Sequence, residues 1–486
     1  IPIYGAPIVK DVSDDNGFSY KVNAETRYMD SEAYLGIGFY PQYKYNNLYL
    51  SAKINIFIDS EKNIYNNWTG GNNIVEKFHL RYSRSDYRNS LSVHAGYIPN
   101  VTFGHGYLVN NLSNSLEYPL RHDTGFRIDY KLDNDFMRFK FFSPSLRDYF
   151  NQGGILGFHT SLFLSHRFPL TLGFGIITDL NQFSQATRIY KGVSLSDLEN
   201  LGQRKVTAAE FDFDINIINT MNLEISLFGE FVGIWYPHNM YYMRFEGSEA
   251  QIILGDDKRW RRGTWGIMAP GISINFDNKN EIRFALNFNS AGFYPSYFNS
   301  NYLYNKSVYF RTDVPLGFQT LDDISLLNEQ IEMLNEFSID NDEVEFLFPK
   351  EIYPLVYNKF STSPVVGFTF EYKYNFRNKA EISGLLSRYT QRAKVVPSYV
   401  YYTIEGKLSI KDNLLKNISN IDLYLSNIFF IGTKDIQEFV LGMNMGIKLP
   451  FSMSLIFDLT QVYYDSNLDG NKNEMMNVGI NFGINL

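Results

Sequence analysis

The sequence predicts an all-β fold, a single large antiparallel transmembrane β-barrel of about 20 strands, within a range of about 16 to 20. Apolar and polar residues alternate with a period of two, connections alternate between short and long, and aromatic residues make up 17% of the chain. Because a barrel needs no solid core, all 486 residues can belong to one such domain.

The alternation is clearest at the C-terminal end of the chain. Val478, Ile480 and Phe482 alternate with small or polar residues, and the pattern continues to Leu486. A period of two places the apolar residues on one face of a strand and the Asn and Gly residues on the other. The apolar face suits contact with lipid, and the polar face suits a wet interior.

The same alternation recurs in segments 54–58, 211–217, 223–227, 284–288 and 368–376. A soluble sandwich would alternate too, with its apolar face buried. The predicted strands run to about 10 to 13 residues, however, which suits a tilted membrane strand better than a soluble strand of about 5 or 6. We therefore expect six phenylalanines to face outward: Phe211, Phe213, Phe284, Phe288, Phe368 and Phe370.

The connections between predicted strands alternate in length. Short turns fall at positions 46–47, 133–134, 168–169, 220–221, 277–280, 378–379 and 450–451. Long connections fall at positions 59–73, 99–122, 180–204, 237–262 and 293–363. Short turns on one rim and long loops on the other are the arrangement of barrels in the outer membrane, and a sandwich has no reason to keep it.

These features resemble the porin-like class of outer-membrane β-barrels over nearly the whole chain, although Leu486 stands where many such proteins end in Phe. The resemblance implies the bacterial outer membrane, with its lipids as surroundings, short periplasmic turns and long extracellular loops. The alternation in loop length then places the N- and C-termini in the periplasm. We expect residues 1–17 to form a periplasmic tail and residues 18–486 the barrel, with a long loop insertion at 293–363.

Composition excludes several classes of function. The chain has no Cys, which excludes disulfides and thiolate catalysis, and its net charge of −8 argues against a nucleic-acid partner. The sequence has no run of about 18 apolar residues, so it predicts no membrane-spanning helix. His159 and Ser161 place a base near a nucleophile, as do Ser165 and His166, but no third group is marked, so we predict no enzyme activity.

Charged residues of both signs occupy the polar phase of the predicted strands. Opposed acidic and basic walls would orient polar solutes in a lumen, and salt bridges among the same residues would make it rigid. The predicted pore-lining residues are Arg127, Asp129, Lys131, Arg138, Lys140, Asp212, Asp214, Glu224, Arg283, Glu371 and Lys373.

Two loop segments are candidates to narrow the lumen. Residues 103–109 are too apolar for an exposed loop, so they either fold inward as a constriction or form a further strand, with His105 as a structural residue. Within the insertion, Leu327, Ile331 and Leu334 form one apolar helical stripe. That helix would cap the pore mouth or pack as an ordinary loop helix.

Two further motifs have alternative interpretations. The segment 465–474 resembles the start of a calcium loop, but Met476 stands where the closing Glu belongs, and a polar turn has the same composition. Its four candidate ligands are Asp465, Asn467, Asp469 and Asn471. Ca²⁺ is thus the one cofactor that the sequence suggests, and none is required.

The basic segment 258–262 would attract anionic solutes, bind lipid phosphates or form a solvated rim.

The sequence therefore predicts a channel or uptake porin that passes small polar solutes without chemistry. The alternative is a non-conducting surface barrel that serves as an adhesin, a receptor or a scaffold for a partner protein. Either could form a homo-oligomer. The polar lumen is common to both and does not separate them.

Overall fold

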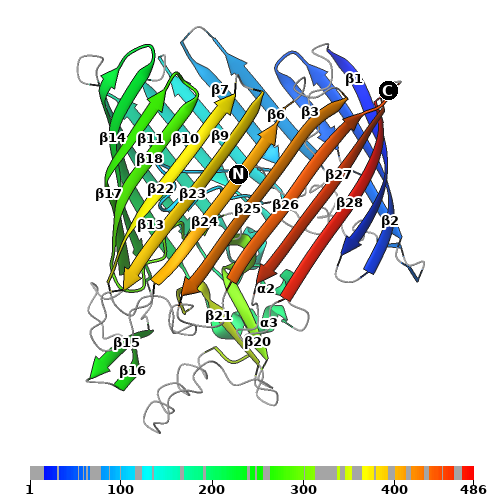
Figure 1. The fold of residues 1–486 in the computed structure, drawn as a ribbon. Helices are drawn as coiled ribbons and strands as arrows, with labels where there is room; N and C mark the ends of the chain where they lie inside the picture. Colours follow the sequence, from blue (N-terminus) through cyan, green and yellow to red (C-terminus); the bar gives the residue numbers. More distant parts are fainter. Residues whose placement is uncertain are drawn as a thin grey trace.

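The first strand joins the two ends of the sheet. β1 (Gly17–Met29) pairs antiparallel with β2 (Glu32–Tyr45) on one side and with β28 (Asn473–Asn485) on the other. The sheet therefore closes on itself as a barrel (Figure 1). Among the described residues, the 22 strands of this sheet occupy 20 positions around the ring. β3 (Leu48–Ala52) and β4 (Ile54–Ile58) form one interrupted strand, and the two-residue β5 (Ile64–Tyr65) is a short extension paired with β4. The predicted closed antiparallel barrel is confirmed.

The computed structural model describes residues 16–29, 32–52, 54–58, 60–61, 64–65, 78–86, 88–98, 100–114, 123–133, 136–164, 169–189, 193–237, 241–246, 249–254, 263–299, 302–311, 337–339, 345–352, 364–376, 379–391, 400–411, 417–431, 437–450, 453–464 and 473–485. Within these residues, no helix is long and apolar enough to cross a membrane.

Between β2 and β28 the ring runs through strands that pair antiparallel with their neighbours. These strands are β3 (Leu48–Ala52), β4 (Ile54–Ile58), β6 (Phe78–Ser85), β7 (Ser90–Gly96), β9 (Gly125–Leu132), β10 (Met137–Ser143), β11 (Ile155–Phe163), β12 (Leu170–Asp179), β13 (Val206–Asn219), β14 (Leu223–Trp235), β17 (Gly263–Phe276), β18 (Asn280–Asn289), β22 (Val365–Phe376), β23 (Ala380–Gln391), β24 (Val400–Ile410), β25 (Ile418–Ile431), β26 (Gln437–Lys448) and β27 (Met453–Tyr464).

The outer face of the barrel is apolar and aromatic. Phe211, Phe284, Phe288 and Phe370 are exposed there, and Phe368 stacks on Phe284 with ring centroids 5.9 Å apart. The remaining predicted phenylalanine, Phe213, stacks on the exposed ring of Phe231. All six predicted outward phenylalanines therefore share this face, where lipid would surround them.

Short turns and long loops lie at opposite rims (Figure 1). The turn residues Asn46, Asp277 and Asn278 have positive φ, which Asn and Asp tolerate in tight hairpins. The other rim carries short helices and hairpins, all but η1 (Arg147–Asn151) within connections that the sequence predicts as long loops. They are η1, α2 (Ala186–Ile189), α3 (Leu195–Leu201), α4 (Tyr302–Asn305), η4 (Lys350–Ile352) and the hairpins β15 (Tyr241–Glu246) with β16 (Glu249–Leu254) and β20 (Ser307–Arg311) with β21 (Glu345–Pro349).

A hydrophobic core lies inside the barrel. Residues 100–114, here called the inward loop, pack against the segment that follows β18, and β8 (Val109–Asn110) pairs parallel with β19 (Phe298–Asn299). The core joins loop and wall side chains, including Phe103, Leu108, Phe142, Phe228, Phe293 and Phe298. Two outcomes follow. The alternative that residues 103–109 add a strand to the ring is wrong, and the lumen is not wholly wet, because loops fill part of it.

Candidate functional site

One wall carboxylate anchors the inward loop. The buried Glu230 of β14 accepts hydrogen bonds from the backbone N–H groups of His105 at 2.7 Å, Tyr107 at 3.1 Å and Leu108 at 3.1 Å. Gly104 has a φ of +43°, and a Cβ there would lie 3.0 Å from Glu230 Oε2. Hydrogen bonds to a buried carboxylate are worth more than neutral ones, so Glu230 holds the loop against the wall.

Three predicted pore-lining cations also hold the inward loop. Lys140 Nζ donates to the Thr102 carbonyl at 2.6 Å, and Arg127 Nη1 donates to the Asn100 carbonyl at 3.3 Å. Arg283 Nη2 lies 2.6 Å from His105 Nδ1. These three side chains therefore hold the inward loop against the strands from which they project. The prediction that His105 is structural agrees with this contact.

Burial and the nearby Arg283 guanidinium lower the pKa of His105 to about 4. The imidazole is therefore neutral near pH 7. Because Arg283 can only donate, Nδ1 accepts its hydrogen bond and the ring proton resides on Nε2. His105 is therefore a neutral residue of the inward loop that lies beside the positive charge of Arg283.

The structure pairs other predicted pore-lining residues with one another. Arg127 binds Asp129 through two hydrogen bonds of 2.6 and 3.0 Å, and Arg283 Nη1 donates to Glu371 Oε2 at 3.3 Å. Lys373 Nζ lies 3.9 Å from Glu381. The expected ion pairs are therefore present among these residues, and their effect on the rigidity of the lumen stays a prediction. Lys131 is exposed in β9, next to the turn into β10.

A polar cavity of about 930 Å³ lies on the short-turn side of the inward loop. His105 lines it at the loop, and Asp133 and Pro169 line it at the short turns. Four predicted pore-lining residues contribute to its wall: Arg138, Asp214, Glu224 and Arg283. Both signs of charge therefore face one chamber large enough for a small polar solute.

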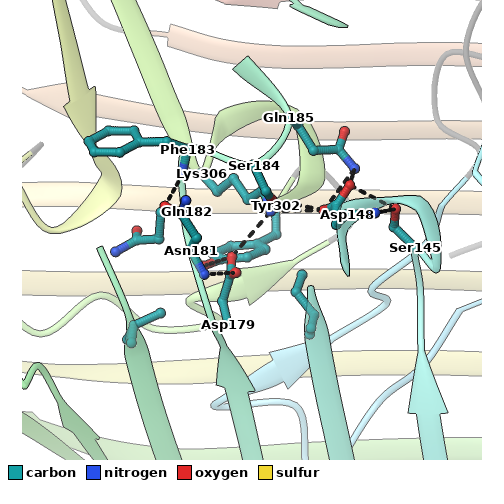
Figure 2. Close-up of polar contacts among 12 residues, drawn as sticks. Ser145, Asp148, Asp179, Asn181, Gln182, Phe183, Ser184, Gln185, Tyr302 and Lys306 are labelled. Carbon is teal, nitrogen blue, oxygen red and sulfur yellow. Dashed lines mark hydrogen bonds and ion pairs between the residues drawn. The ribbon is translucent and has the colours of Figure 1, made fainter. Parts of the chain in front are cut away.

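A second group of buried polar residues ties the long loops together (Figure 2). Lys306, which follows α4, lies 3.1 Å from Asp148 of η1 and 3.4 Å from Asp179 at the end of β12, and its Nζ also donates to Ser184 Oγ at 2.6 Å. Gln185 Nε2 donates to Asp148 at 3.0 Å. We call these five residues the loop network.

The charges of the loop network compensate one another. Burial disfavours the charged form of Lys306, but Asp148 and Asp179 outweigh it and raise the lysine pKa. Burial likewise raises the pKa of Asp148, but Lys306, Ser145 and Gln185 outweigh it and hold that pKa below its ordinary value. Removal of Lys306 would leave Asp148 and Asp179 buried together without a cation to compensate them.

Sequence reasoning missed the loop network and the buried Glu210 of β13. Lys306 lies in the long insertion, whose packing leaves no local pattern. A signal for Glu210 did exist: the inward positions opposite Glu210 and Asp212 on β12 are Gly175 and Gly173, which leave room for large side chains from a neighbouring strand.

Several predicted features lie outside the described residues. They are the calcium motif at 465–471, the basic segment 258–262, the helical stripe at 327–334, and Ser165 with His166. His159 is described, and its Nε2 lies 3.0 Å from Asp212 Oδ2. The expected division at residue 17 stays a prediction, although β1 begins there.

No protein-family model and no curated protein matches the chain. In fold it is similar to Pseudomonas aeruginosa OccK5 (OpdH), with 8% identity, 97% of this chain and 99% of that chain covered, and a TM-score of 0.38. It is also similar to the siderophore receptor PirA from Acinetobacter baumannii (8% identity, 98% and 81% covered, TM-score 0.41).

A third similar structure is Wzi, an outer-membrane protein involved in group 1 capsule assembly in Escherichia coli and a carbohydrate-binding β-barrel. Its identity is 10%, the comparison covers 96% of this chain and 84% of that chain, and the TM-score is 0.35. The assignment of a barrel rests on the strand pairing of the chain itself.

Proposed function

We propose that this protein is a bacterial outer-membrane channel for small polar solutes, narrowed by the inward loop. The observation that carries the proposal is the anchoring of that loop by Glu230 above a polar cavity of about 930 Å³. In this proposal the short-turn rim faces the periplasm, and the cavity is the periplasmic vestibule of the channel.

The chemistry of the vestibule favours solutes that carry polar or charged groups. Asp214 and Glu224 face the chamber together with Arg138 and Arg283. Opposite charges on the wall of a narrow passage orient a dipolar or zwitterionic solute and resist apolar ones. Passage requires no bond to form or break, so the channel acts without catalysis.

The opposite wall continues the polar lining. Asn420 Nδ2 donates to Asp422 at 3.0 Å and to Asn444 Oδ1 at 2.6 Å, and Asn444 in turn donates to Asp458. Ser409 donates to Asp422. This polar ladder of Ser409, Asn420, Asp422, Asn444 and Asp458 crosses β24 to β27 and supports a water-filled passage along that wall.

Single-channel conductance in planar bilayers tests the proposal. Glu230→Gln removes the charge that binds three backbone N–H groups, which should weaken the loop anchor by about 2 to 4 kcal/mol and raise the conductance. Glu371→Gln is the matched control, because Glu371 lies on the lumen wall and bonds Arg283 rather than the loop backbone. Glu371→Gln should change the ion selectivity, and it should not raise the conductance as Glu230→Gln does.

The alternative function is a non-conducting barrel that serves as a scaffold for a partner protein. The hydrophobic core inside the barrel favours it, because Phe103, Phe228 and Phe298 fill lumen space that a wide pore would leave open. If neither the wild type nor Glu230→Gln conducts, and the protein co-purifies with another chain, the channel proposal fails and the scaffold replaces it.

A further inference from the structure

Three residues from two strands converge beneath the inward loop. His159 Nε2 of β11 lies 3.0 Å from Asp212 Oδ2 and 3.6 Å from Glu210 Oε1, both on β13. The strand between them, β12, places Gly175 beside His159 and Glu210. A Cβ at Gly175 would lie 2.8 Å from Glu210, and a Cβ at Gly173 would lie 2.0 Å from Asp212 Oδ2. Because Gly173 and Gly175 have no side chain, His159 can reach across β12 to the two carboxylates on β13.

Glu210 is the member of this cluster whose bonding is incomplete. It is 2% exposed, and neither of its carboxylate oxygens accepts a hydrogen bond. Its neighbours include two further carboxylates, because Asp212 lies two residues along β13 and pairs across to Glu230. A buried carboxylate without donors is costly, and three buried carboxylates side by side repel one another unless positive charge compensates them.

The cations already present do not meet that need. Lys140 interacts electrostatically with Glu210, but its Nζ donates its hydrogen bond to the Thr102 carbonyl at 2.6 Å. The Glu230 carboxylate is held by three backbone N–H groups of the inward loop. Glu210 and Asp212 therefore still need a positively charged group, and His159 lies beside both of them.

The geometry of the cluster fits a divalent transition metal. In a tetrahedral zinc site with bonds of about 2.0 to 2.2 Å, the ligand atoms lie about 3.2 to 3.6 Å apart. The two distances from His159 Nε2, 3.0 and 3.6 Å, bracket that range, and all three ligand atoms lie within 4.8 Å of one another. One imidazole with two carboxylates also suits zinc or its first-row neighbours.

A second cluster, His105 with Asp212 and Asp214, also falls within 4.8 Å but suits a metal less well. Arg283 donates to His105 Nδ1 at 2.6 Å, which leaves the proton on Nε2, the nitrogen that faces Asp214 at 3.6 Å. A protonated nitrogen cannot bind a metal, and the guanidinium repels one.

We propose that His159, Glu210 and Asp212 form a binding site for a divalent transition metal, with Zn²⁺ the preferred ion, inside the barrel wall. The inward loop covers this site, since the Phe103 ring stacks on His159 with centroids 5.1 Å apart. A bound ion cross-links β11 to β13 beneath the loop and neutralises the carboxylates there. The site is separate from solute passage and does not require the channel to conduct.

Metal binding by the full-length protein in detergent tests the proposal. The protein is stripped with a chelator and dialysed against Zn²⁺, and bound zinc is counted by mass spectrometry. Co²⁺ is added in parallel, because its visible absorption reports the ligand set. We expect one ion per wild-type chain, and Glu210→Gln, which keeps the side-chain shape, should weaken the affinity at least about tenfold.

The matched control is Asp214→Asn, which belongs only to the second cluster and should retain zinc. Circular dichroism verifies that both variants are folded. The proposal is overturned if the folded wild type binds no more Zn²⁺ or Co²⁺ than Glu210→Gln. That result would indicate a proton shared between Glu210 and Glu230 in place of a metal. Loss of zinc in Asp214→Asn with retention in Glu210→Gln would also overturn it, because the ion would then belong to the His105 cluster.

Discussion

The two sides of the lumen wall use the same kind of residue in opposite ways. On the side of β10 to β18, inward carboxylates such as Glu210 and Glu230 are fully buried beneath the inward loop. On the side of β24 to β27, the acidic groups Asp422 and Asp458 are only partly buried and bond to neighbouring Ser and Asn side chains in the polar ladder.

The difference shows that strand phase decides which residues face inward, and the covering loop decides what they do. Beneath a loop, a carboxylate must find donors or a cation, so it becomes an anchor. Where solvent reaches it, the same group needs no fixed partner and can line a passage. Changes on the covered side should therefore cost far more than matched changes on the open side.

The largest contrast is expected between two lysines. Lys306→Met leaves Asp148 and Asp179 buried without their counter-ion and should lower the free energy of unfolding by about 3 to 5 kcal/mol. Lys407→Met removes a partly exposed lysine that binds Glu381 at 3.1 Å on the open side, and should cost about 1 kcal/mol or less. Guanidinium unfolding in detergent measures both, and equal losses would contradict the contrast.

A smaller contrast is expected between Gly173, on the inward face of the covered wall, and Gly406, which has the outward phase of β24. Gly173→Ala would push a Cβ to 2.0 Å from Asp212 Oδ2, so the carboxylate must shift and the variant should lose about 1 to 3 kcal/mol. Gly406 on β24 has nothing within 4 Å of the same position, and Gly406→Ala should be neutral or slightly stabilising. If Gly406→Ala were as harmful as Gly173→Ala, the crowding of Asp212 against β12 would not be what makes Gly173 necessary.

The smallest expected effect is a pH dependence of the inward loop. The pKa of His105 is lowered from 6.5 to about 4 when the loop is in place, so a released loop takes up a proton first. Acidification from pH 6.5 towards 4 therefore destabilises the anchored loop, and conductance should rise over that window. His105→Gln should flatten the response, and an unchanged pH profile in that variant would remove His105 from the account.

The sequence predicted the barrel well because its features are local. Alternation identified the outward phase of Phe211 and Phe284, and turn residues such as Asn46 identified the short-turn rim. Phe142 and Phe228 are apolar residues that face inward, and they could have indicated a wall covered by a loop. Alternation alone does not distinguish such inward apolar residues from outward ones.

The covered part of the lumen was not predictable because it depends on pairing between distant segments. Val109 pairs with Phe298, and Lys306 bonds Asp148, across separations that no local pattern reports. The alternation predicts the strand face of the candidate pore-lining residues, and whether they line a pore stays a prediction. Which of them anchor a loop, as Lys140 does, and which face the cavity, as Glu224 does, follows only from the loop packing.

The most direct measurement locks the inward loop with a reversible bond. The chain has no native Cys, and a Cβ at Gly104 would lie 3.1 Å from Asp212 Cβ, close to the separation of about 3.5 to 4.5 Å in a disulfide. The variant Gly104→Cys/Asp212→Cys/Glu230→Gln is then recorded in planar bilayers before and after reduction. We predict a small, wild-type-like conductance when oxidised and a large conductance when reduced. Equal conductance in the two states would contradict the claim that the anchored loop narrows the channel.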